Sequence, residues 1–133
     1  MEIYKSEFVS AYFDAASSIL TQVWSDKSIE MNEDAYKTEI LNYVQQLETY
    51  QAKKTLADLS EFNYTIVPEL QDWHAKTVFP YALKQSNFKA AMILPHDLFS
   101  QVSIEQTIEE GKDIQFQSKY FDNEADAINW LNS

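Results

Sequence analysis

The sequence predicts a single α/β domain with a mixed sheet, in which N-terminal antiparallel strands precede βαβαβα units. Residues 90–94 (Ala-Ala-Met-Ile-Leu) form an unbroken apolar run between Lys89 and Pro95, which is typical of a strand covered on both faces. Strand-like and helix-like segments alternate along the chain around this run, and such an order indicates crossover connections and a parallel section of sheet. A chain of 133 residues suits one domain with a buried core.

The first 24 residues predict an antiparallel meander. Apolar and aromatic residues are mixed with polar ones over residues 3–14, which indicates one or two strands, and residues 14–17 (Asp-Ala-Ala-Ser) indicate a turn. Over residues 18–24, Ile19, Thr21 and Val23 alternate with Leu20, Gln22 and Trp24. This period of two favours an antiparallel partner.

The sequence predicts a helix most clearly over residues 32–51. Asn32 is placed to cap its first turn, and apolar side chains recur every three or four residues at Tyr36, Ile40, Tyr43, Val44, Leu47 and Tyr50. Residues 54–59 then predict a short buried strand, and residues 61–67 a loop.

Pro68 suits the first turn of the next helix. A second proline, Pro80, lies inside the same helical pattern. Proline removes an amide and clashes with the preceding turn, so we expect a kink or break near Phe79, with residues 81–85 as a short continuation.

The central strand, residues 88–94, is expected to lead into a helix that Asp97 caps. Ser103 and Gln106 form a second start signal, so residues 104–110 are expected to begin a new turn. Gly111, the only glycine, is placed for the left-handed residue after a helix.

The last two elements follow from shorter patterns. Apolar and polar side chains alternate over residues 114–120, which predicts an edge strand with one solvent-exposed face. Asn123 is placed to cap a final helix, whose inward residues are expected to be Ala127, Ile128 and Leu131.

Composition excludes several classes of function. Ten Lys and Arg against 21 Asp and Glu give a net charge of −11, which disfavours nucleic acid and anionic membranes as partners. The acidity favours solubility first and a basic protein partner second. No cysteine is present, so thiol nucleophiles, Cys-ligated zinc and thiol switches are excluded. The N-terminus lacks a signal-peptide pattern and no stretch reaches membrane-span length, so we expect a cytoplasmic protein.

Several stretches together carry a family resemblance. They are Trp73, residues 78–80 (Val-Phe-Pro), residues 88–95 (Phe-Lys-Ala-Ala-Met-Ile-Leu-Pro), residues 99–101 (Phe-Ser-Gln), residues 120–124 (Tyr-Phe-Asp-Asn-Glu), Ala127, and residues 130–131 (Trp-Leu). In these the chain resembles the small bacterial STAS/SEC14-like proteins, related to the SpoIIAA-like fold. The resemblance implies a mixed α/β sheet and a group in which many members have no established activity.

The resemblance does not bring a phosphorylation switch with it. The better-known relatives, anti-sigma-factor antagonists, carry an Asp-Ser pair at the start of the helix after the corresponding strand, and the serine of this pair is phosphorylated. The matching residues 58–67 have no such pair before the helix, and Thr65 is the only hydroxyl near its start. A lipid-binding role like that of the larger SEC14 proteins is unsupported, because the chain is short for enclosing an acyl chain.

Polar residues follow two of the predicted parallel strands. In open α/β sheets ligands bind beyond the carboxyl ends of the strands, which here carry Asp58 with Ser60, and His96 with Asp97. If those strands are neighbours, the four side chains indicate a polar ligand site or a Ser-His-Asp hydrolase. A structural role for these residues, at a strand end, in a turn and as a helix cap, is favoured over a catalytic one. The reason is that the sequence has no nucleophile elbow.

Metal and cofactor sites are not predicted. His74 has Val78 rather than a second ligand four residues later. One glycine cannot build a phosphate cradle. We therefore expect no metal and no cofactor.

Four aromatic residues, Phe62, Tyr64, Phe79 and Tyr81, flank the loop and the proline of one helix. They are expected to cover the end of the core or, if exposed, to dock a second copy or another protein. The sequence thus predicts a non-enzymatic regulatory or protein-interaction domain, with a homodimer as one form. The alternative is a binder of a small apolar or lipid-like ligand near the proline-containing helix. A hydrolase using Ser60, His96 and Asp58 is the least favoured.

Overall fold

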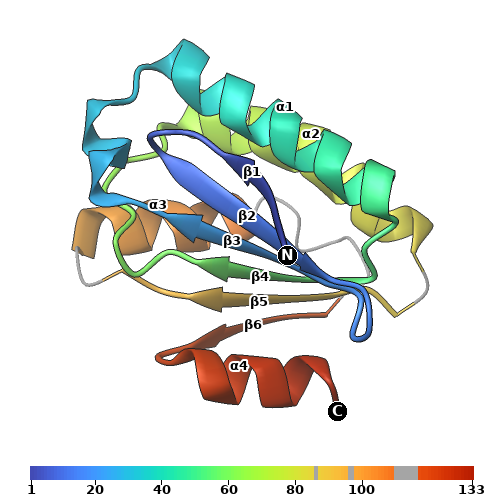
Figure 1. Ribbon diagram of the computed structural model, residues 1–133. Coiled ribbons are helices and arrows are strands. Elements are labelled where there is room, and N and C mark those ends of the chain that lie inside the picture. Colours follow the sequence, from blue (N-terminus) through green and yellow to red (C-terminus); the bar gives the residue numbers. More distant parts are fainter. Residues whose placement is uncertain (86, 96–97, 110–116) are drawn as a thin grey trace.

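The computed structural model of the protein describes residues 1–85, 87–95, 98–109 and 117–133. Six strands form one sheet in the order β1-β2-β3-β4-β5-β6 (Figure 1). The strands are β1 (Glu2–Lys5), β2 (Val9–Asp14), β3 (Ile19–Trp24), β4 (Lys54–Asp58), β5 (Lys89–Ile93) and β6 (Gln117–Phe121). The first three pair antiparallel, and β3 to β6 pair parallel. The predicted mixed sheet is confirmed.

The helices form a layer on each side of this sheet. The connecting helices are α1 (Glu33–Tyr50), α2 (Pro68–Lys84) and α3 (Leu98–Glu109), and a 3₁₀ turn, η1 (Asp26–Glu30), precedes α1. Helix α2 packs between α1 and α3, while α4 (Glu124–Leu131) packs against β4, β5 and β6. Figure 1 shows α1 and α2 on one side of the sheet and α4 on the other.

Side-chain caps fix the starts of two helices, as the sequence predicts. The Asn32 side chain accepts a hydrogen bond from the Ala35 amide at 2.7 Å at the start of α1. The Asn123 side chain does the same for the Asp126 amide at 2.9 Å at the start of α4. Each cap satisfies one of the amides that a first helical turn leaves without a partner.

Two expected interruptions do not occur. Helix α2 continues through Pro80 to Lys84, so a break with a separate continuation is wrong. Phe79, Tyr81 and Ala82 are buried beside the proline, and this packing holds the last turn in place despite the lost amide. Helix α3 also runs through Ser103, which is buried inside it. The expected new start there is wrong, because a capping residue needs a non-helical backbone.

The central strand β5 is covered on both faces. Ala91 and Ile93 pack with Ala127 and Leu131 of α4, whereas Met92 belongs to the cluster on the opposite face. This arrangement confirms the predicted coverage on both faces, although in the strand order β5 lies next to the edge strand β6 rather than in the middle of the sheet. The caps expected at Asp97 and Gly111 lie outside the described residues.

Strand β6 is the edge strand that the sequence predicts. Its first four residues, 117–120, are all exposed, whereas the alternating pattern predicted a single wet face. Among the described helices, α4 is the main one packed against this strand, so little of the strand is covered.

Candidate functional site

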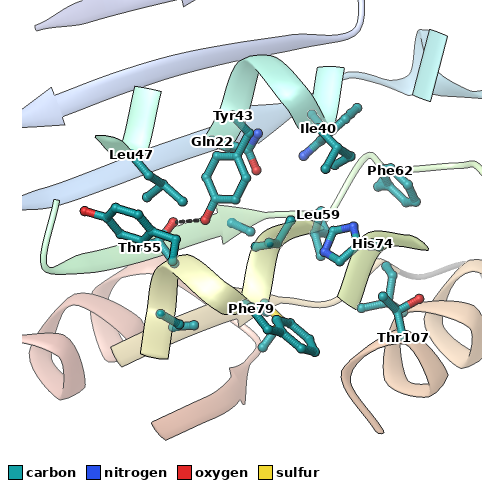
Figure 2. A pocket seen from close by; sticks show the side chains of 18 of the residues that line it. Gln22, Ile40, Tyr43, Leu47, Thr55, Leu59, Phe62, His74, Phe79 and Thr107 are labelled. Carbon is teal, nitrogen blue, oxygen red and sulfur yellow. Dashed lines mark hydrogen bonds between the residues drawn. The ribbon is translucent and has the colours of Figure 1, made fainter. Parts of the chain in front are cut away.

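A cavity of about 110 Å³ lies between the sheet and the three helices α1, α2 and α3, which cover one of its faces. Its floor is formed by helix-facing side chains of β3, β4 and β5, and its walls by α1, α2, α3 and the loop that precedes α2. Figure 2 shows ten labelled lining residues, which converge from these elements. The labelled residues are Gln22, Ile40, Tyr43, Leu47, Thr55, Leu59, Phe62, His74, Phe79 and Thr107.

Small side chains on the floor create this space. Ala57 on β4 and Ala90 on β5 face the helices, and both are only partly buried although their strands are central. Larger neighbours, Trp24 and Met92, are buried beside them. An interior at ordinary packing density has few voids larger than a water molecule, so this cavity is an exception that calls for an explanation.

Most polar groups that line the cavity are satisfied inside the protein. The Thr55 hydroxyl donates to the Leu20 carbonyl at 3.1 Å, so the Tyr43 hydroxyl donates in turn to Thr55 Oγ1 at 2.7 Å (Figure 2). Burial raises the pKa of Tyr43 to about 12, which keeps its hydroxyl protonated. The Tyr81 hydroxyl donates to the Ala52 carbonyl at 2.8 Å. These hydroxyls therefore add little polarity to the cavity surface.

Tyr36 and His74 form a second polar contact in the wall. The Tyr36 hydroxyl lies 2.7 Å from His74 Nδ1 and joins α1 to α2. Burial raises the pKa of Tyr36 and lowers the pKa of His74 to about 4. Removal from water disfavours the charged form of each group, so both are uncharged at neutral pH.

Gln22 is the exception among the polar lining residues. It is 5% exposed and stands on the floor of the cavity. Figure 2 shows no hydrogen bond between its carboxamide and the other lining residues that it draws. The sequence carries a signal for this residue, because Gln22 has the same alternation phase as the buried Leu20 and Trp24.

The polar residues predicted at the strand ends are only partly brought together. Strands β4 and β5 are neighbours, as that hypothesis requires. Asp58 Oδ1 accepts hydrogen bonds from the Ser60 amide at 3.1 Å and from the Ser60 hydroxyl at 2.7 Å. This is a local turn of the kind that Asp forms with its own chain. His96 and Asp97 lie outside the described residues.

A second, open hollow of about 460 Å³ lies beyond the same strand ends. Ser60, Pro95, Tyr120 and Asp122 are among the residues that line it. Its position agrees with the general rule for ligand sites in α/β sheets. However, the Ser60 hydroxyl that it contains already donates to Asp58 within the local turn.

The four aromatic residues lie at the core rather than on an exposed surface. Phe62, Phe79 and Tyr81 are buried, and Tyr64 is partly buried and stacked on Tyr36 with ring centroids 5.3 Å apart. Phe62, Phe79 and Tyr81 also line the cavity. These residues therefore cover the core, which is the first of the two roles expected from the sequence. Phe79 and Tyr81 also place the proline-containing helix α2 at the wall of the cavity.

No group of three or more His, Cys, Asp or Glu residues that could hold a metal ion occurs within the described ranges. None of the helices that the structure describes is long and apolar enough to cross a membrane. No family model, curated protein or solved structure gives a significant match to this chain.

Proposed function

We propose that this protein is a non-enzymatic binding domain that holds a small apolar molecule in the cavity between its sheet and α1, α2 and α3. The observation that carries the proposal is the cavity itself, about 110 Å³ of space in the middle of the core. Ligand sites are typically concave and mostly apolar, with a few placed polar groups. The lining described above has this composition.

The volume limits the size of the ligand. A dry protein cavity of about 150 Å³ holds one benzene molecule. A cavity of about 110 Å³ therefore suits a molecule of roughly four to six non-hydrogen atoms. Larger lipid-like molecules need the helices to move apart from the sheet.

Benzene and xenon are suitable first probes, since both enter a dry apolar cavity of about 150 Å³, and benzene has the six non-hydrogen atoms that mark the upper limit for this cavity. We expect amide chemical shifts of the residues around Ala57 and Met92 to change in a two-dimensional NMR titration, because these residues form the floor. Ala57→Leu fills the floor beside Gln22 and should abolish the changes. Ala90→Val serves as a second filling variant if Ala57→Leu does not fold.

Ala125→Leu is the matched control, because Ala125 is exposed on α4, on the other side of the sheet. This variant should bind both probes as the wild type does. Absence of shift changes in the wild type, or equal changes in the filled variant, would overturn the proposed function.

A second candidate function, protein interaction through a homodimer, has a different observation in its favour. Helix α4 packs mainly against β4 to β6, and Tyr12 on β2 and Val23 on β3 are 38% and 37% exposed. Val23 lies opposite Ser10, two residues from Tyr12, so the two apolar side chains are diagonal neighbours on one sheet face. The patch is small, which places this candidate second.

Sedimentation of the wild type and of the double variant Tyr12→Ser, Val23→Ser tests this candidate. A dimer that becomes a monomer in the variant supports it. A monomeric wild type at high micromolar concentration overturns the homodimer.

We also propose that the chain is a distant relative of the small STAS/SEC14-like proteins that its sequence resembles. The support is the order of elements, an antiparallel meander followed by βαβ units with a last helix on the opposite face. An experimental structure with another strand order would overturn this kinship.

A further inference from the structure

The position of Gln22 makes its carboxamide part of the cavity floor. Its backbone is paired on both sides, with Ala11 of β2 and Ala57 of β4. Ala57 in turn pairs with Met92 of β5, so Gln22, Ala57 and Met92 lie side by side across three strands. Because the middle residue is an alanine, the Gln22 side chain borders open space rather than another long side chain.

The carboxamide of Gln22 has a hydrogen-bonding capacity that the protein does not use. A glutamine side chain carries two N–H donors and a carbonyl acceptor, and the large majority of buried side-chain polar atoms have a hydrogen-bond partner. Gln22 is 5% exposed, yet Figure 2 shows no hydrogen bond between its carboxamide and the other lining residues that it draws. An apolar residue of similar size would fill the same place without this cost, so the polar group is an anomaly for a purely structural role.

The rest of the lining restricts the charge of any ligand. No Lys, Arg, Asp or Glu is found among the described residues that line the cavity. The imidazole of His74, which also lines the cavity, is joined to the Tyr36 hydroxyl through Nδ1 and is uncharged at neutral pH. An anion placed here would be buried without a counter-charge, which is strongly unfavourable.

From these three observations we infer that the cavity takes a neutral molecule with an apolar body and one hydroxyl, carbonyl or carboxamide group, which hydrogen-bonds to the Gln22 carboxamide. This inference rests on the proposed function and adds the chemical class of the ligand. Hydrophobic burial of the body supplies the affinity, and the single polar contact fixes the orientation. A carboxylate of the same shape is rejected.

Three probes of nearly the same shape test this inference. Butyramide, butyrate and 2-methylpentane each have six non-hydrogen atoms and the same propyl chain. The chain ends in a carboxamide in butyramide, in a carboxylate in butyrate, and in a CH group with two methyl groups in 2-methylpentane. NMR titration of the wild type should show that butyramide and 2-methylpentane bind in the cavity and that butyrate does not. The hydrocarbon is supplied as a saturated solution because it dissolves poorly.

The variant Gln22→Leu removes the polar group and keeps the size of the side chain. We expect its affinity for butyramide to fall about tenfold, the loss of one net hydrogen bond, while its affinity for 2-methylpentane is kept or increased. Gln22→Met serves the same purpose if Gln22→Leu does not fold. Gln46→Leu is the matched control, because the Gln46 Oε1 atom is also buried without a partner but the residue does not line the cavity. This control should keep the selectivity of the wild type.

The outcomes separate this inference from the proposed function. If benzene enters the cavity but Gln22→Leu leaves the ratio of butyramide to 2-methylpentane affinity unchanged, the inference is wrong and the proposed function stands. Binding of butyrate as tightly as butyramide would also overturn the inference. If no probe, including benzene, perturbs the lining residues of the wild type, both fall together.

Discussion

The Tyr36 hydroxyl on α1 lies 2.7 Å from Nδ1 of His74 on α2. This contact joins two helices that pack against each other, and both residues line the cavity. The same neighbourhood is rich in aromatic rings, since Tyr36 also stacks on Tyr64 and contacts Trp73 edge-on. The pair therefore fixes one wall of the candidate site, and its protonation state affects both stability and the site.

The first prediction concerns the pH dependence of stability. Burial lowers the pKa of His74 to about 4, whereas an unfolded chain binds this proton near pH 6.5. The unfolded state therefore binds more protons between these values, and the free energy of unfolding falls as the pH decreases from about 6.5 to about 4. We expect this one group to account for a loss on the order of 3 kcal/mol.

Urea unfolding at several pH values between 7.5 and 4 measures this loss. Carboxylates also titrate at the lower end, so the wild type is compared with His74→Gln, which has no ionisable group at this position. The difference in free energy of unfolding between the two proteins should be constant above pH 7 and should shrink steadily below pH 6.5. Parallel curves over the whole range would contradict the prediction.

A buried carboxylate supports the second prediction. Glu39 on α1 is 5% exposed and accepts hydrogen bonds from the Tyr4 hydroxyl at 2.7 Å and from the Ser6 hydroxyl. These bonds fasten β1 and the turn after it to the helix. Burial, and then the hydrogen bond to Glu39, raises the pKa of Tyr4, as expected for a phenol that donates to a carboxylate.

We expect Tyr4→Phe to lower the free energy of unfolding by about 2 kcal/mol, because a hydrogen bond to a charged buried group is lost. Tyr12→Phe is the matched control, since Tyr12 is exposed on the neighbouring strand, and it should change stability by less than about 0.5 kcal/mol. Denaturant unfolding of both variants at pH 7 provides the comparison. Equal effects of the two substitutions would show that the Tyr4–Glu39 bond adds nothing.

The third prediction concerns the start of α2. Val67 occupies the N-cap position with an extended backbone, and its side chain makes no capping hydrogen bond. It is also largely exposed. Val67→Ser should raise the free energy of unfolding by about 1 kcal/mol, because serine accepts a bond from the free amides of the first turn. Val67→Ala, which only shortens the side chain, is the control, and a serine variant no more stable than the alanine variant would contradict the prediction.

The fourth prediction is that Gln22→Leu makes the ligand-free protein more stable. Gln22 is 5% exposed, and Figure 2 shows no hydrogen bond between its carboxamide and the other lining residues that it draws. Replacing such a group by an apolar one of similar size removes a desolvation penalty of about 1–3 kcal/mol. We expect a gain of about 1 kcal/mol in thermal or urea unfolding. A loss of stability would mean that Gln22 contributes to the fold itself.

The elements of this fold follow from local patterns in the sequence. The helix that begins after Asn32 is fixed by a cap and by an apolar stripe, and both act within a few residues along the chain. The apolar run at residues 90–94 indicates double coverage, which α4 and the opposite cluster provide. Periodicity of two or of 3.6 residues is a property of the chain itself, so it can be read before the tertiary structure is known.

The tertiary structure decided the features that depend on packing between distant segments. Helix α2 continues through Pro80 because its last turn is buried against other elements, which the local sequence does not report. The cavity exists because Ala57 and Ala90 of separate strands meet beneath helices that do not fill the space above them. Whether Gln22 has a partner depends in the same way on every neighbouring segment, since a hydrogen bond needs two groups in register and empty space is a property of no single residue.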